Sequence, residues 1–165
     1  MSFSPFQPFD QFDRTVTSWM ADNGIMLLRL SIGLIFLWFG GLKFFPGLSP
    51  AENLAGSTIE LLTFGLVPAT IGLPVLALWE CLIGIGMFLP KFMRITIFFL
   101  YFQMLGTFSP VLLLPEVVFQ SFPLALTMEG QYIFKNLIVI TAALIIGATV
   151  RGGRLYSEPA NPPRS

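Results

Sequence analysis

The sequence predicts an all-α fold: an integral membrane four-helix bundle with short outer-loop helices and an N-terminal interfacial segment. Two observations predict this fold class. The chain is 55% hydrophobic and 11% charged, a composition outside the usual range of soluble proteins. It also contains four apolar segments of about twenty residues. At ~1.5 Å per residue, each is long enough to cross a ~30 Å hydrocarbon layer.

The apolar segments divide the 165 residues into three parts. Residues 1–24 are expected to form an N-terminal amphipathic cytoplasmic segment, and residues 153–165 a cytoplasmic tail. Between them, residues 25–152 are expected to form a single four-span membrane domain. The spans are predicted at about 25–45, 69–89, 95–114 and 131–150.

The basic residues predict how the spans are oriented. Six of the nine lie before the first span, between the second and third, or after the fourth, whereas the intervening loops carry mainly glutamates. By the positive-inside rule, both termini are expected to be cytoplasmic in a multi-pass protein of the inner or plasma membrane. The residues that set this orientation are Arg14, Lys91, Arg94, Arg151, Arg154 and Arg164.

Aromatic and apolar residues recur every three or four positions before the first span. The pattern runs from Phe3 through Phe12 to Trp19, with charged residues in between. It is typical of an amphipathic helix, and we expect a helix or turn in the cytoplasmic membrane interface. Because Pro5 and Pro8 limit helix formation near the start, a loosely ordered aromatic tail is the alternative.

The loop between the first two spans carries helix-start signals. Residues 49–52, Ser-Pro-Ala-Glu, place a Ser N-cap before a Pro at the first helical position and a Glu at the third. Residues 57–60, Ser-Thr-Ile-Glu, form a second capping box of the same Ser-x-x-Glu pattern. One or two short helices are therefore expected over the outer mouth of the bundle.

The residue types that are rare or absent limit the chemistry. The chain has no His, and Cys81 is its single Cys. This excludes an intrachain disulfide, a CxxC pair, histidine ligation of haem or zinc, and Ser-His catalysis. Nine basic residues balance nine acidic ones, which argues against nucleic-acid binding. We expect no metal and no covalently bound cofactor, and any chemistry of the chain alone would have to use carboxylate, amine, amide or hydroxyl groups.

Glu80 is the single charged residue in the predicted span 69–89. A charge at the centre of a membrane helix costs roughly 2.5–3.5 kcal/mol, so such a carboxylate faces a partner or a cavity and marks a candidate functional site. Counting from the cytoplasmic ends puts Glu80 and Gln103 near the membrane midplane. Arg29 is the preferred ion-pair partner of Glu80. The alternative is that Arg29 extends to the cytoplasmic interface.

Further polar side chains share helical stripes with these residues, and the prolines at 74 and 110 free backbone carbonyls in the outer halves of their spans. We therefore predict a pocket that opens outward and is floored by Glu80 and Gln103. The alternative is hydrogen bonding between helices that only fixes their packing. Trp79 and Tyr101 are interpreted as packing aromatics rather than as a quinone clamp. The candidate ligand-binding or polar-core residues are Arg29, Trp38, Lys43, Glu80, Gln103, Thr107, Lys135 and Asn136.

Four strings are distinctive: LRLSIG at 28–33, FLWFGGLKF at 36–44, Glu80 followed by Gly84, and EGQY at 129–132 leading to KNL at 135–137. Together they resemble the DoxX-like family of small four-helix membrane proteins. The closest branch is the YkgB-like group, which includes reactive-chlorine-resistance membrane proteins. The resemblance covers about residues 25–152.

The resemblance implies an inner-membrane protein linked either to quinone-dependent sulfur oxidation or to oxidative-stress resistance. We expect a membrane subunit or binding protein for a lipophilic redox-active or stress-related small molecule, such as a quinone. An oxidoreductase partner would then carry the electrons. A noncatalytic membrane scaffold or assembly factor is the alternative. A small proton or solute transporter, which four spans would form as a homo-oligomer in the lipid bilayer, is a third interpretation.

Overall fold

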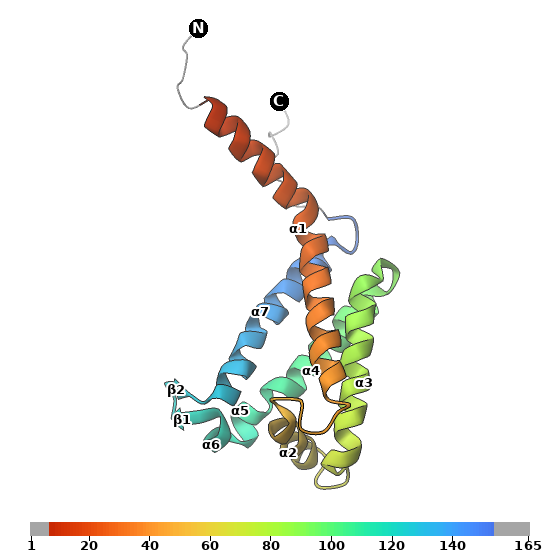
Figure 1. Ribbon diagram of the computed structural model, residues 1–165, viewed down its shortest axis with the longest axis vertical. Coiled ribbons are helices and arrows are strands. Elements are labelled where there is room, and N and C mark those ends of the chain that lie inside the picture. The colour runs from red at the N-terminus through yellow and green to blue at the C-terminus, as the bar shows by residue number, and fades with distance from the viewer. Residues whose placement is uncertain (1–6, 154–165) are drawn as a thin grey trace, which may run out of the picture.

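The computed structural model describes residues 7–153, with side chains from residue 10 onward, and most of this range is helical (Figure 1). Within it, four helical segments are long and apolar enough to cross a membrane. The prediction of a mostly helical chain with four such segments is confirmed. Three of them are single helices: α1 (Gln7–Leu42), α3 (Ala69–Phe88) and α7 (Met128–Thr149). The fourth, Pro90–Leu113, joins η1 (Pro90–Phe92), α4 (Met93–Phe108) and α5 (Pro110–Leu113).

Helix α1 differs from the prediction because the N-terminal segment and the first span form one helix. It has 36 residues and is therefore about 54 Å long. Pro8 lies in its first turn, where backbone N–H groups have no acceptor within the helix, so the missing donor has no cost. Phe3 and Pro5 lie outside the described residues, as does the tail after Gly153.

The third predicted span is interrupted near its outer end. Helix α4 ends at Phe108, and Pro110 begins the four-residue α5. Because proline has no N–H to continue the α4 ladder, a new helix starts there. Pro74, by contrast, lies inside α3 without ending it.

One short helix between the first two apolar helices, α2 (Glu52–Leu62), is present as predicted, and it crosses the lower end of the bundle in Figure 1. The capping boxes work differently from the prediction. Glu52 Oε2 accepts a hydrogen bond from Gly47 N at 2.6 Å, so it orders the preceding turn. Glu60 Oε1 accepts from Ala69 N at 3.0 Å, and Ala69 is the first residue of α3. Glu60 therefore connects α2 to the start of the second span.

A small hairpin, which the sequence did not predict, precedes α7. Helix α6 (Pro115–Val118) leads into strand β1 (Phe119–Ser121), which pairs antiparallel with β2 (Ala125–Leu126). Thr127 joins this hairpin to α7. Its Oγ1 donates to Val117 O at 2.6 Å and accepts from Gly130 N at 3.0 Å, which caps the helix.

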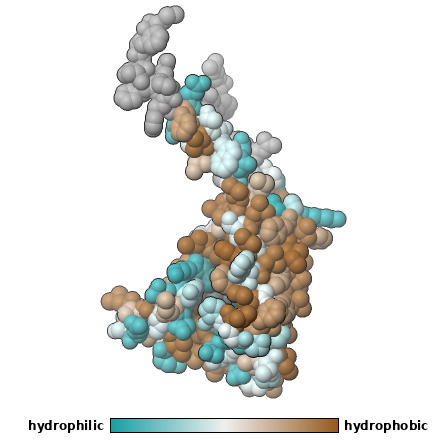
Figure 2. All heavy atoms as spheres, in the orientation of Figure 1, coloured by the Kyte–Doolittle hydropathy of each residue, from teal (hydrophilic) through white to brown (hydrophobic). Residues whose placement is uncertain are grey.

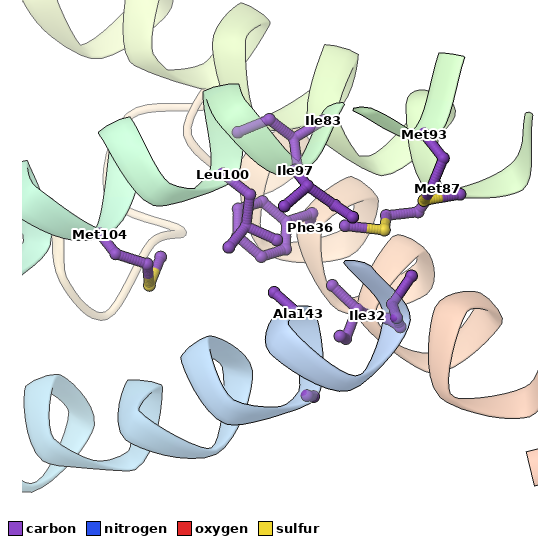
Figure 3. Packing of buried hydrophobic residues seen from close by; sticks show 11 residues of the cluster. Ile32, Phe36, Ile83, Met87, Met93, Ile97, Leu100, Met104 and Ala143 are labelled. Carbon is purple, nitrogen blue, oxygen red and sulfur yellow. The ribbon is translucent and has the colours of Figure 1, made fainter. Parts of the chain in front are cut away.

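The hydrophobic core joins all four long helices in one half of the bundle. Ile32 and Phe36 of α1 meet Met87 of α3, Leu100 of α4 and Ala143 of α7, and each is 7% exposed or less (Figure 3). These residues lie where α3 ends and α4 begins. The half of the bundle next to α2 contributes little to this cluster.

The flank of the bundle is apolar, as lipid-facing helices require. Leu78, Phe98 and Ile138 are each more than half exposed, with exposed fractions of 54%, 65% and 70%. In Figure 2, brown atoms dominate the bundle, whereas teal atoms gather near α2 and the hairpin and are mixed with brown along the projecting part of α1. The surface thus agrees with a membrane-spanning arrangement.

Glycines set how closely α1 and α3 approach each other. A Cβ atom added to Gly84 would lie 2.7 Å from Leu37 Cγ and 2.9 Å from Gly33 O. One added to Gly40 would lie 2.9 Å from Glu80 Cβ. These contacts make the pair antiparallel and fix its register. Small residues at such an interface are a common means of helix association in membranes.

We expect Gly84→Ala to destabilise the protein, because the new methyl group would meet α1 backbone atoms that cannot move aside. The expected loss is about 1–3 kcal/mol in the free energy of unfolding, measured by SDS titration in mixed micelles. Gly41→Ala is the matched control, since a Cβ there meets nothing within 4 Å. The control is expected to be neutral or up to about 1 kcal/mol more stable. Equal losses in both variants would contradict the glycine contact.

Candidate functional site

Side chains from three parts of the chain meet at Glu80. Lys43 Nζ lies 2.6 Å from Glu80 Oε2, and Gln103 Nε2 donates to Glu80 Oε1 at 3.1 Å. Glu80 belongs to α3 and Gln103 to α4, while Lys43 directly follows the last residue of α1. Each carboxylate oxygen therefore has a partner. We refer to these three residues as the Glu80 cluster.

The ion pair in this cluster is enclosed. The side chains of Lys43 and Glu80 are 9% and 12% exposed. Removing two charges from water costs several kcal/mol per ion, which their attraction offsets only at close range and with further hydrogen bonds. The Gln103 amide supplies such a bond. Gln103 lies level with Glu80 in the bundle, as predicted by counting residues from the ends of the two spans.

The end of α1 favours a cation at position 43. Lys43 Nζ also donates to Phe39 O at 3.4 Å, and Phe39 is within the last four residues of α1. The last carbonyls of a helix carry partial negative charge and have no donor within the helix. Because Gly40 lies directly against Glu80, Lys43 is only about one turn away and its side chain reaches the carboxylate.

The predicted ion pair between Arg29 and Glu80 is wrong. Arg29 Nε and Nη2 both donate to Met87 O, at 3.3 and 3.2 Å. Met87 is the residue before the last of α3, so Arg29 binds the carbonyl end of that helix. The antiparallel register explains the exchange, because Arg29 lies level with the end of α3, two turns away from Glu80. Lys43 belonged to the predicted site, but its role as counterion was missed.

Two further predicted site residues, on α1 and α4, are not among the hydrogen-bond partners of the Glu80 carboxylate in the described part of the chain. Trp38 is 66% exposed and lies on the flank of α1. Thr107 Oγ1 donates to Gln103 O at 3.1 Å, within its own helix. Thr107 thus supports the backbone of α4 next to the cluster rather than joining two helices.

The two predicted site residues on α7 also bond within their helix. Asn136 Nδ2 donates to Tyr132 O at 3.0 Å, and Lys135 Nζ lies 5.2 Å from the centre of the Tyr132 ring. Lys135 is exposed. Of the polar residues considered for interhelical hydrogen bonds, only Gln103 makes one among the described contacts.

A hollow of about 500 Å³ lies at the C-terminal end of α2, away from the predicted pocket. The Glu80 cluster does not line it. Lys43, which follows the last residue of α1, lies on the side of Glu80 on which the predicted pocket was expected to open. The residues lining the hollow are Ser57, Glu60, Leu61, Phe64 and Gly65.

Trp79 and Tyr101 lie beside the hydrophobic core. The Trp79 ring packs against Phe99 and Phe102, with centroid distances of 4.9 and 5.7 Å. These contacts favour the interpretation of Trp79 as a packing aromatic. Within the described residues, Trp79 Nε1 and Tyr101 Oη are buried without a hydrogen-bond partner.

The chemistry available to the Glu80 cluster is hydrogen bonding and proton exchange. Within residues 10–153, no group of three His, Cys, Asp or Glu side chains could hold a metal ion. The ammonium and the amide are donors, and the carboxylate and the amide oxygen are acceptors. In the described part of the chain, no hydrogen bond reaches Gln103 Oε1. The cluster can therefore orient a polar group or exchange a proton with it.

Four helices that are long and apolar enough to cross a membrane indicate a multi-pass membrane protein. Comparisons of the chain with protein-family models, with curated proteins and with solved structures give no match. The resemblance to the DoxX-like family, based on residues 28–44 and the later strings, therefore stays a prediction.

We expect Lys43→Met to be strongly destabilising, because it leaves an enclosed carboxylate without a counterion. Breaking a buried ion pair on one side costs about 3–5 kcal/mol. Combining it with Glu80→Gln should recover much of this loss, since neither charge then remains. Unfolding free energies of both single variants and the double variant measure the coupling in a double-mutant cycle. Additive losses would show that the two side chains do not interact.

Arg29→Met tests independently whether Arg29 or Lys43 is the counterion of Glu80. We expect a loss of about 1.5–3 kcal/mol in unfolding free energy, the usual contribution of a charged hydrogen bond, because the Met87 carbonyl loses its donor. Its coupling to Glu80→Gln should stay below about 0.5 kcal/mol, as for separated sites. A coupling as large as that between Lys43 and Glu80 would restore Arg29 as the counterion.

Proposed function

We propose that the chain is a multi-pass inner-membrane protein of the DoxX-like type that binds a lipophilic redox-active or stress-related small molecule at the Glu80 cluster. It acts as a membrane subunit or binding protein, and an oxidoreductase partner carries the electrons. The observation that carries this proposal is the ion pair between Lys43 and Glu80, enclosed among three helices of an apolar bundle.

The chemistry of the cluster fits a quinone-like ligand. A ring carbonyl can accept a hydrogen bond from the Lys43 ammonium or the Gln103 amide, and a quinol hydroxyl can donate to the Glu80 carboxylate. The outer half of the bundle, next to the cluster, lies outside the main hydrophobic core. A pocket with apolar walls and a few polar groups is the usual site for such a molecule.

The proposed orientation places both ends of the membrane domain in the cytoplasm. Four spans return the chain to the side on which it began, and Arg14, Lys91, Arg94 and Arg151 belong to the segments on that side. The Glu80 cluster then lies near the middle of the membrane, with α2 and the β1–β2 hairpin on the outer side.

A noncatalytic scaffold or assembly factor is the second candidate, and one observation favours it. Both oxygens of Glu80 already have partners from the chain itself. Satisfied polar groups between membrane helices specify packing without any ligand. The two candidates differ in whether removing the Glu80 charge affects ligand binding or only stability.

Glu80→Gln separates the two functions, because it preserves side-chain shape and removes the charge. We expect about tenfold weaker binding of a short-chain quinone, as for the loss of a 1.4 kcal/mol contact, measured by quenching of tryptophan fluorescence in detergent. Survival of hypochlorite by cells that depend on this chain should fall in parallel. Glu116→Gln is the matched control, since Glu116 is exposed outside the spans.

The amount of each variant in the membrane fraction is measured alongside. If the Glu80→Gln protein inserts normally, binds the quinone like wild type and protects cells fully, the ligand-binding proposal is wrong. Unchanged binding together with loss of a co-purifying partner would favour the scaffold.

A further inference from the structure

The first half of α1 extends beyond the rest of the bundle. α1 pairs with α3 only as far as the end of α3 at Phe88, which Arg29 reaches through Met87 O. About twenty residues of α1 precede that level, roughly 30 Å of helix. Figure 1 shows this part projecting past the other helices.

The projecting part carries a heptad repeat. Six residues follow one another at alternating intervals of four and three, the spacing of the a and d positions in a coiled coil. We call this stripe the α1 seam. In a and d order, Val16, Asn23 and Leu30 occupy a, whereas Phe12, Trp19 and Met26 occupy d.

The seam is apolar, accessible and flanked by polar residues. Phe12, Trp19 and Met26 are 68%, 57% and 48% exposed, and Val16 and Leu30 are each 37% exposed. The residues between them in the first two heptads are mostly polar or small, as expected for a helix with one contact face. Between Phe12 and Asn23 these residues are Asp13, Arg14, Thr15, Thr17, Ser18, Met20, Ala21 and Asp22.

The seam continues an interface that is already formed. The next positions at the same spacing are Gly33, Leu37 and Gly40, all of which contact α3. One heptad register therefore runs along the whole helix. Its second half is occupied by α3, and its first half begins where α3 ends.

We propose that the α1 seam binds the α1 seam of a second copy of this chain as a parallel two-stranded coiled coil. Copies inserted in one membrane share one orientation, so their α1 helices run parallel. Asn23 favours a like partner, because an Asn at an a position can hydrogen-bond to its counterpart across the axis and specifies register in such dimers. A heterologous helix would have to supply a polar residue at the same level.

The area available fits a dimer. With large side chains burying ~150–250 Å² each, the exposed fractions leave roughly 500 Å² per chain, or about 1,000 Å² for the pair. This reaches the lower bound for a specific interface. The seam therefore supports association in the membrane, where both copies are confined and aligned.

Disulfide cross-linking of the full-length protein in membranes tests the proposal. Cys81→Ala removes the native thiol, and single variants Val16→Cys, Trp19→Cys and Asn23→Cys place a thiol on the seam. Thr17→Cys and Ala21→Cys are matched controls on the other faces of the same turns. Facing a and d positions lie close to the ~4.4–6.8 Å Cα separation of a disulfide, so oxidation should link seam variants at least about fivefold more than controls.

A second measurement uses Asn23→Val, because a polar a residue lowers dimer stability while fixing its register. We expect tighter self-association, with the dissociation constant lowered about tenfold in single-molecule photobleaching or energy transfer in lipid bilayers. Thr17→Val should leave it unchanged.

Three results would overturn the proposal. They are equal cross-linking of seam and control positions, no effect of Asn23→Val, and seam cross-links that join the chain to another protein instead of to itself. Quenching of the seam by brominated lipid without any dimer would be a fourth such result, and it would assign the stripe to the membrane surface.

Discussion

The position of Glu80 requires a cation within reach, and the register between α1 and α3 decides which cation that is. Gly40 brings α1 against Glu80, so the lysine one turn later meets the carboxylate. The same register carries Arg29 to the end of α3, where it binds a free carbonyl. A shift of one helical turn between the two helices would leave the carboxylate at that depth without its counterion. Close glycine packing and charge neutralisation therefore support each other.

The sequence predicted the spans well and the ion pair poorly, for different physical reasons. A run of about twenty apolar residues has few alternatives to a membrane helix, so α3 and α7 begin and end within about three residues of the prediction. Helical periodicity places Arg29 and Lys43 on one stripe but does not determine how far one helix slides along its neighbour. The depth count did place Arg29 nearer the cytoplasmic end of its span than Glu80, but we expected its side chain to span the gap, whereas the Met87 carbonyl lies closer.

The short sequence motifs in the loops also predicted the structure there only in part. Helix α2 forms where the capping boxes indicated, yet Glu60 binds the start of α3 rather than its own helix end. That contact depends on a chain reversal, which a four-residue pattern does not encode. The β1–β2 hairpin was missed because its strands are very short and bounded by prolines and aromatic residues. Within the predicted site, the convergence of Glu80 with Gln103 was recognised because both lie at the same depth.

The two charged partners of the ion pair belong to successive spans, and this has a consequence for how the chain enters the bilayer. A helical hairpin of α1 and α3 contains both Lys43 and Glu80, whereas Gln103 lies in the span made afterwards. If the two helices insert together, the lipid receives a neutral pair instead of two separate charges. The ion pair would then align the first two spans during biosynthesis, before α4 and α7 complete the bundle.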